Sequence, residues 1–112
     1  MSIEIWHNPR CSKSRQTLAL LEERGIAPSI LRYLDEPPDV SRLREIAALL
    51  GGAGRLVRRK EPSFAERGLA EASEEELLEA MAEAPILIER PVVITPKGAR
   101  IGRPPESVLE IL

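Results

Sequence analysis

Alternating and helical runs of apolar residues divide the first third of the chain into a strand, a helix and a second strand. Residues 3–6 (IEIW) alternate apolar and polar positions, which predicts a short strand that ends before Pro9. Leucines at helical spacing follow in residues 12–24, and Gly25 is a suitable helix stop. Residues 29–34 (SILRYL) predict the second strand. Such a unit is parallel and right-handed, and it places its first loop at the carboxyl edge of the sheet, where ligands bind.

The rest of the chain predicts a helical insertion, a β-hairpin and a last helix. In the insertion, helical spacing covers residues 39–50, shorter pieces within 53–72 and, after a capping box at Ser73 and Glu76, residues 73–84. Strands at 91–95 and 99–101 with a turn at 96–98, and a short helix at 106–112, complete the chain. The order β-α-β, helical insertion over about 39–84, β-β-α predicts an α/β protein with a thioredoxin-like fold in a single domain, residues 1–112.

Composition and charge narrow the class of protein. The chain has 112 residues, 43% hydrophobic and 30% charged, which is typical of one soluble globular domain. No apolar run reaches the roughly 20 residues of a spanning helix, and the N-terminus lacks the pattern of a secretion signal. A net charge of −2 does not favour general nucleic-acid binding. We therefore expect a cytoplasmic protein, monomeric, with neither nucleic acid nor a membrane as partner.

The only cysteine and the only histidine lie close together in HNPRCSKSR, residues 7–15. A single cysteine cannot form an internal disulfide. Cys11 lies where the first loop meets the helix N-terminus, whose free N–H groups and dipole favour the thiolate. The cations Arg10, Lys13 and Arg15 act in the same direction, so the pattern predicts a lowered pKa for Cys11. The alternative is a small buried cysteine without reactivity.

Two neighbours of Cys11 have candidate roles. His7 would add to the stabilisation of the thiolate if protonated, or accept the thiol proton if neutral. Ser14 stands where a Cys-x-x-Cys motif has its second thiol, so any redox cycle needs an external thiol. The amides of the helix N-terminus, with Arg15 and Ser14, could hold an oxyanion, while Ser14 is also a candidate helix cap.

Five blocks in order resemble the glutaredoxin-coupled arsenate reductase family, or ArsC family, in particular its shorter arsenate-reductase-like members. The blocks are HNPRCSKSR, RYLDEPP, LVRRKEP, ILIERPVVIT and ARIGRPPESVLEIL, and they span essentially the whole chain. Members of that family have a thioredoxin-like fold with an all-helical insertion. They reduce arsenate to arsenite with glutathione and glutaredoxin as electron donors.

The resemblance implies a role for six residues. Cys11 matches the nucleophile, and His7 matches a histidine proposed to lower the pKa of that cysteine. The arginines around the arsenic oxyanion match Arg58, Arg90 and Arg103, and the cis-proline facing the cysteine matches Pro91. Arg59 could replace Arg58 if the register shifts by one, and Arg103 could instead pair with Glu106 in a turn.

The activity implied is that of an oxidoreductase, an arsenate reductase of the glutaredoxin type with a redox-active cysteine. Its partners would be arsenate or a similar oxyanion, glutathione as co-substrate and glutaredoxin, without a metal or a bound cofactor. Two alternatives stay open. One is a glutathione-dependent thiol or disulfide reductase acting on another substrate. The other is a redox-sensing interaction module in which oxidation of Cys11 changes a surface that a partner recognises.

Overall fold

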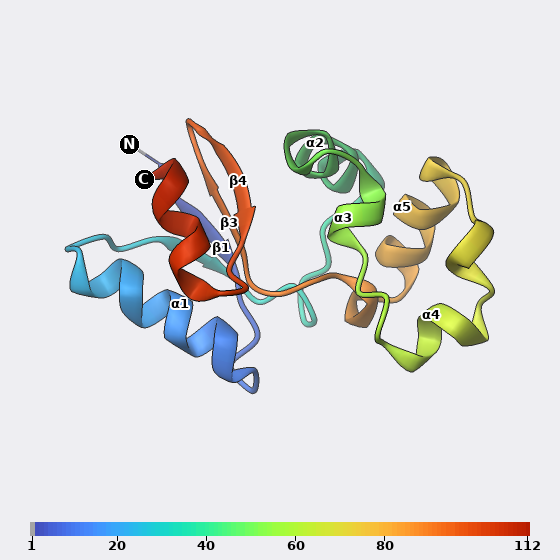
Figure 1. Ribbon diagram of the computed structural model, residues 1–112, viewed down its shortest axis with the longest axis horizontal. Coiled ribbons are helices and arrows are strands. Elements are labelled where there is room, and N and C mark those ends of the chain that lie inside the picture. The colour runs from blue at the N-terminus through green and yellow to red at the C-terminus, as the bar shows by residue number, and fades with distance from the viewer. Residues whose placement is uncertain (1) are drawn as a thin grey trace. The chain divides into compact units, whose positions relative to one another are not determined.

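The computed structural model describes residues 2–112 and confirms a mixed α/β, thioredoxin-like fold (Figure 1). Two segments, Met1–Glu36 and Arg90–Leu112, form one compact unit. Its elements are β1 (Glu4–Trp6), α1 (Ser12–Glu23), β2 (Ser29–Leu31), β3 (Val92–Thr95), β4 (Gly98–Ile101) and the 3₁₀ helix η3 (Pro105–Ile111). The sheet order is β2-β1-β3-β4, with β1 parallel to β2 and antiparallel to β3.

One buried apolar cluster of this unit lies on a single face of the sheet. Because side chains of extended chain alternate, Ile5 of β1 and Ile3, which directly precedes the strand, point to the same face. Ile5 pairs with Ile30 of β2 and with Val93 of β3. Helices α1 and η3 cover this face side by side (Figure 1). The buried cluster consists of Ile3, Ile5, Leu21, Val93, Val108 and Ile111.

The helical insertion forms a second compact unit, Pro37–Glu89, slightly wider than the expected 39–84. Its elements are α2 (Val40–Leu50), α3 (Ala53–Leu56), α4 (Pro62–Glu66), η1 (Leu69–Glu71), α5 (Glu74–Glu83) and η2 (Pro85–Leu87). The capping box at Ser73 and Glu76 is present at the start of α5. Among residues 2–112, no helix has the length and the apolar character needed to cross a membrane.

Two boundaries differ from the sequence prediction. Strand β2 ends at Leu31 rather than residue 34, because the chain turns at Arg32, whose carbonyl accepts the amides of Asp35 and Glu36, each at 2.9 Å. The last helix is a 3₁₀ helix that starts at Pro105, after a cis Arg103–Pro104 bond. The first difference frees residues 32–35 to form a loop beside the carboxyl edge of β1.

Candidate active site

The cysteine loop, residues 7–15, joins β1 to α1, and Cys11 is the N-cap residue of that helix. Asn8 shapes the loop through two contacts. Its carbonyl accepts the amide of Cys11 and its Oδ1 accepts the amide of Arg10, both at 3.0 Å. The Cys11 side chain is free and partly exposed. The thiol therefore lies at the start of a helix, where unpaired amides stabilise negative charge.

His7 and Ser14 form a buried hydrogen-bonded pair behind this loop. The His7 ring is 7% exposed and Ser14 is fully buried. His7 Nδ1 lies 2.7 Å from Ser14 Oγ, which also accepts the backbone amide of Asn8 at 3.0 Å. The helix-cap prediction for Ser14 is therefore wrong, because Cys11 holds the cap position and Ser14 lies one turn inside the helix. The Ser14 hydroxyl fixes the loop from within. That Ser14 contributes to binding an oxyanion stays a prediction.

His7 does not add positive charge to the site at neutral pH. Burial of the ring, followed by the charges of Arg32 and Arg15, lowers the pKa of His7 below its ordinary value. The protonated form that would have stabilised the thiolate is therefore disfavoured. His7 is a neutral partner of Ser14, and it acts on the position of the cysteine loop.

On the other side of Cys11 lies the arginine edge, formed by Arg90, Pro91, Gly102 and Arg103. The Arg90–Pro91 bond is cis, the geometry that the family resemblance implies for Pro91. Arg103 Nη1 lies 3.8 Å from Cys11 Sγ and donates to the Arg90 carbonyl at 3.2 Å. The guanidinium thus takes up the contact with Cys11 rather than the alternative pairing with Glu106.

Gly102 allows this edge to approach α1 closely. A Cβ atom at Gly102 would lie 2.5 Å from Thr17 Oγ1 and 2.8 Å from Pro91 Cγ. The Gly102 amide donates to the Pro91 carbonyl at 3.0 Å, which joins the end of β4 to the start of β3. Only a residue without a side chain fits here, so Gly102 positions Arg103 beside the thiol.

The surroundings of Cys11 favour its thiolate form. Partial burial is the largest single influence and raises the pKa of the thiol. It is outweighed by the Ser14 amide, the charge of Arg90, the Lys13 amide and the hydrogen bond from Arg103, in that order. The pKa of Cys11 therefore lies below its ordinary value, as the sequence predicts, although the agents differ from those expected.

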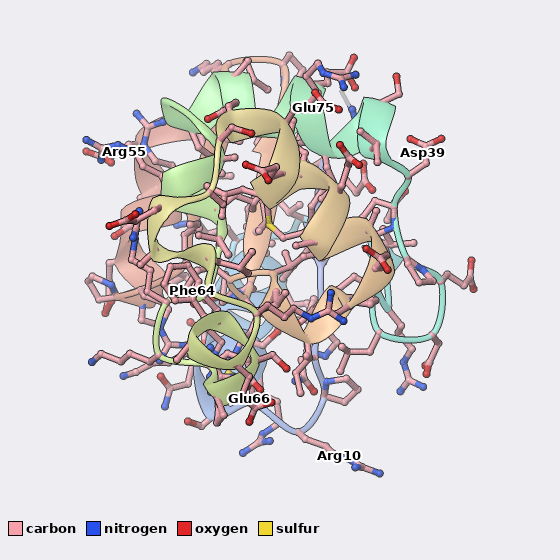
Figure 2. The ribbon with its side chains drawn as sticks, turned by 90° about the vertical axis from the view of Figure 1, so that its right-hand side faces the viewer. Arg10, Asp39, Arg55, Phe64, Glu66 and Glu75 are labelled. Carbon is pink, nitrogen blue, oxygen red and sulfur yellow. The ribbon has the colours of Figure 1, made fainter. Side chains whose placement is uncertain are left out.

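The cations nearest in sequence do not produce this shift. Arg15 is exposed, and its Nη1 donates to the Pro9 carbonyl at 2.8 Å. The Arg10 side chain extends from the loop into solvent (Figure 2). Lys13 acts through its backbone amide and not through its charge. Within residues 2–112, the cations whose side chains lower the pKa of the thiol are Arg90 and Arg103 of the arginine edge.

Arg58 belongs to the insertion, after α3. Its Nη1 lies 3.4 Å from Glu61 Oε2, and its amide donates to the Leu87 carbonyl at 2.6 Å. Arg59 lies over the Phe64 ring, with its guanidinium carbon 5.5 Å from the ring centre. That Arg58, and not Arg59, faces the bound oxyanion stays a prediction. Within residues 2–112, histidine, cysteine and acidic side chains form no group of three or more with the arrangement of a metal site.

The model of the ArsC family matches residues 6–111. This chain belongs to the ArsC family. It is 50% identical to "Uncharacterized protein YfgD" of Escherichia coli K12 over 98% of this chain and 96% of that protein. It is 48% identical to an arsenate reductase of Haemophilus influenzae over the full length of both chains. The structure called "Arsenate reductase from Vibrio cholerae" is 50% identical to this chain, the match covers 100% of this chain and 98% of that one, and the TM-score is 0.95.

Sequence reasoning missed two contributors to this ArsC site. Arg32 follows β2, and its charge acts on His7. The predicted strand 29–34 would contain Arg32, whereas β2 ends at Leu31 and Arg32 lines a cavity together with His7. Gly102 belongs to the block ARIGRPPESVLEIL, but the resemblance assigns it no role. The sequence signal for this role is a glycine directly before Arg103. A larger residue at this position would hold the end of β4 and the start of β3 away from α1.

Proposed function

We propose that this ArsC protein is an arsenate reductase that uses the Cys11 thiolate, glutathione and glutaredoxin. The observation that carries the proposal is the contact of Arg103 with Cys11 Sγ at 3.8 Å, in a site that lowers the pKa of the thiol. A nucleophile beside a guanidinium suits an oxyanion substrate, because the arginine binds the oxygens while the sulfur attacks the central atom. The names of the Haemophilus and Vibrio relatives support arsenate as that oxyanion.

The reaction has three steps with balanced electrons. The Cys11 thiolate attacks arsenic(V), an arsenic–sulfur bond forms, and an arsenic-bound oxygen leaves as water after protonation. Glutathione then forms a disulfide with Cys11. The electron pair of the arsenic–sulfur bond stays on arsenic, which leaves as arsenite. Glutaredoxin attacks the glutathione sulfur of the mixed disulfide and returns Cys11 as a thiolate.

The arginines stabilise negative charge at two stages of this scheme. Arg103 and Arg90 stabilise both the thiolate before attack and the negative oxygens during it, since both charges develop at the same edge. The amides at the N-terminus of α1 add donors without a charge of their own. Arg58, as the family resemblance implies, would complete the oxyanion site from the insertion.

The test is a coupled assay in which NADPH consumption is followed with glutathione, glutaredoxin and glutathione reductase. We expect consumption that depends on arsenate in the wild-type protein and none in Cys11→Ser. Circular dichroism and urea unfolding of the variant provide the control that its fold is intact. Turnover retained in Cys11→Ser, or no arsenate-dependent turnover in the wild type, would overturn the proposal.

The same assay separates arsenate reduction from the two alternatives. A thiol or disulfide reductase for another substrate would reduce a small disulfide such as hydroxyethyl disulfide without any response to arsenate. A redox-sensing module would accept glutathione on Cys11 with negligible turnover of either substrate. Arsenate reduction is the choice that also gives Arg90 and Arg103 a substrate to bind.

A further inference from the structure

A cavity of about 410 Å³ lies between the cysteine loop and the loop that follows β2. Its volume is in the range of pockets that bind small molecules. The lining residues are His7, Asn8, Pro9, Arg10, Arg32, Leu34 and Asp35, and all of them belong to the unit that carries the sheet. The catalytic scheme above uses Cys11 and the arginine edge, so it leaves this cavity without a role.

The charges around the cavity are arranged for a zwitterionic ligand. Arg32 and Arg10 both line the cavity, and the side chain of Arg10 is exposed and extends into solvent. Within residues 2–112, neither guanidinium forms an ion pair or a side-chain hydrogen bond. Asp35 brings one carboxylate to the same cavity. Leu34 adds an apolar wall and is 42% exposed. Two cations, one anion and an apolar surface therefore meet around one hollow.

Backbone hydrogen bonds hold the two walls in place. The His7 amide donates to the Leu31 carbonyl at 2.8 Å and joins the start of one wall to the start of the other. On the far wall, the Asp35 amide donates to the Arg32 carbonyl at 2.9 Å. The Arg10 amide is fixed by Asn8 Oδ1 at 3.0 Å. The cavity is thus built by the backbone before any ligand arrives, which lowers the cost of binding.

We propose that this cavity binds glutathione, with its two carboxylates on Arg10 and Arg32 and its ammonium group toward Asp35. The inference rests on the proposed function, which needs this tripeptide beside Cys11. Glutathione carries a carboxylate and an ammonium group on one side of its central cysteine and a second carboxylate on the other side. These charges match those of the cavity in number and are opposite to them in sign. Guanidinium groups bind carboxylates through paired hydrogen bonds. The cavity is lined by His7, Asn8, Pro9 and Arg10 of the same loop that carries Cys11, so a tripeptide bound there lies beside the loop of the nucleophile.

The binding step can be measured without arsenate through the reaction of Cys11 with oxidised glutathione. The Cys11 thiolate attacks one sulfur of the disulfide, and a new disulfide forms between Cys11 and one glutathione. The other glutathione leaves as a thiolate with the electron pair of the broken bond. Cys11 is oxidised and the leaving sulfur is reduced. Hydroxyethyl disulfide undergoes the same exchange but carries no charge, so it reports the reactivity of Cys11 alone.

The experiment compares the rates of both exchanges, by mass spectrometry at constant ionic strength, in the wild type, Arg32→Ala and Arg24→Ala. Arg24 is an exposed arginine at the end of α1, and its variant controls for the loss of one positive charge. We expect Arg32→Ala to lower the ratio of the glutathione rate to the hydroxyethyl rate by about tenfold, the effect of one lost charge-assisted contact. Arg24→Ala should leave the ratio within about twofold of the wild type. Equal ratios in the two variants would overturn the proposal.

Asp35→Asn gives an independent check of the ammonium contact. It should also lower the preference for oxidised glutathione, although it removes a negative charge from the protein and so favours anions in general. An unchanged or higher preference in this variant would contradict the assigned orientation of the tripeptide. Because the readout is a ratio of two rates, a general change in Cys11 reactivity cancels.

Failure of this inference and failure of the proposed function give different results. If arsenate supports NADPH consumption but Arg32→Ala keeps the preference for oxidised glutathione, the cavity assignment is wrong and the reductase assignment stands. If arsenate supports no turnover but the preference exists and depends on Arg32, the glutathione site stands and the substrate assignment is wrong.

Discussion

The cysteine loop and the arginine edge meet at the same sulfur, yet they contribute to it in opposite ways. The loop contributes a neutral, buried pair, His7 and Ser14. The two side chains are hydrogen-bonded to each other, and the Ser14 hydroxyl also accepts the backbone amide of Asn8. The edge brings exposed charge, with Arg103 at 3.8 Å from the thiol and Arg90 behind it. The loop therefore determines where the sulfur lies and brings the Ser14 and Lys13 amides to it, and the edge adds the positive charges that make loss of the thiol proton easier.

This difference shows that closeness in sequence is a poor guide to electrostatic influence at a helix N-terminus. Arg10 and Arg15 flank Cys11, but one extends into solvent and the other bonds to the Pro9 carbonyl. Arg103 is separated from Cys11 by 92 positions and contacts its sulfur. The sheet order explains this, because β3 pairs antiparallel with β1 and brings the residues that flank the hairpin to the start of α1.

Removing the charge of the edge should have the largest effect. We expect Arg103→Ala to lower kcat/KM for arsenate by about a hundredfold, the usual cost of removing one donor to a charged transition state. Alkylation of Cys11 at neutral pH should also slow, because the pKa of the thiol rises when this hydrogen bond is lost. Arg24→Ala is the matched control for charge. If the two variants behave alike in both assays, the edge does not activate the sulfur.

The second largest effect is expected from a substitution at Gly102, which allows the arginine edge to approach α1 closely. Gly102→Ala inserts a Cβ atom that would lie 2.5 Å from Thr17 Oγ1. We expect the free energy of unfolding to fall by about 3 kcal/mol, as for an overpacked site, and the activation of Cys11 to weaken with it. Gly54→Ala is the control, since its Cβ would meet only the flexible end of Arg59 at 3.1 Å. Urea unfolding checks both variants, and equal stabilities would show that the edge can move away without cost.

The loop side should respond in stability more than in reactivity. Ser14→Ala leaves His7 Nδ1 and the Asn8 amide without their shared partner. We expect a loss of about 1–2 kcal/mol in the free energy of unfolding. The pKa of Cys11 should change little, because the Ser14 backbone amide that lowers it is retained. The exposed Ser12, changed to Ala, is the control. A large change in alkylation at full stability would mean that the hydroxyl itself acts on the thiol.

The smallest expected effect is the dependence of stability on pH that follows from the titration of His7. The pKa of His7 is lower in the folded protein than in the unfolded chain. When the pH falls below about 6.5, His7 is therefore protonated in the unfolded chain before it is protonated in the folded protein. Stability should therefore decrease as the pH falls through that value, and level off below the folded pKa. Because His7 is the only histidine, its NMR signal reports this titration without overlap. Titration at or above the ordinary histidine value would contradict a neutral His7.

Much of the fold could be predicted because its signals are local. The alternation in residues 3–6, the leucine spacing before Gly25 and the capping box at Ser73 each depend on a few adjacent residues. The early end of β2 could not be predicted, because it depends on where two amides find the Arg32 carbonyl. The residues of the last helix suit an α-helix as well as a 3₁₀ helix, so its 3₁₀ form could not be predicted either.

The site divides in the same way. The reactive setting of Cys11 was predictable, since a helix N-terminus acts on any thiol placed there. The buried state of Ser14 and the neutral state of His7 were not, because they depend on packing between β1 and α1. The place of Arg103 followed from the family resemblance and not from spacing. That of Arg58 stays a prediction.

The pH dependence of Cys11 alkylation by iodoacetamide, with and without arsenate, tests the central claim most directly. The account predicts an apparent pKa below the ordinary value of about 8.5 for a free cysteine, and a slower reaction when arsenate is present, because the anion occupies the arginines beside the sulfur. An ordinary pKa together with no protection by arsenate would contradict the account, since neither a stabilised thiolate nor an oxyanion site would then exist at Cys11.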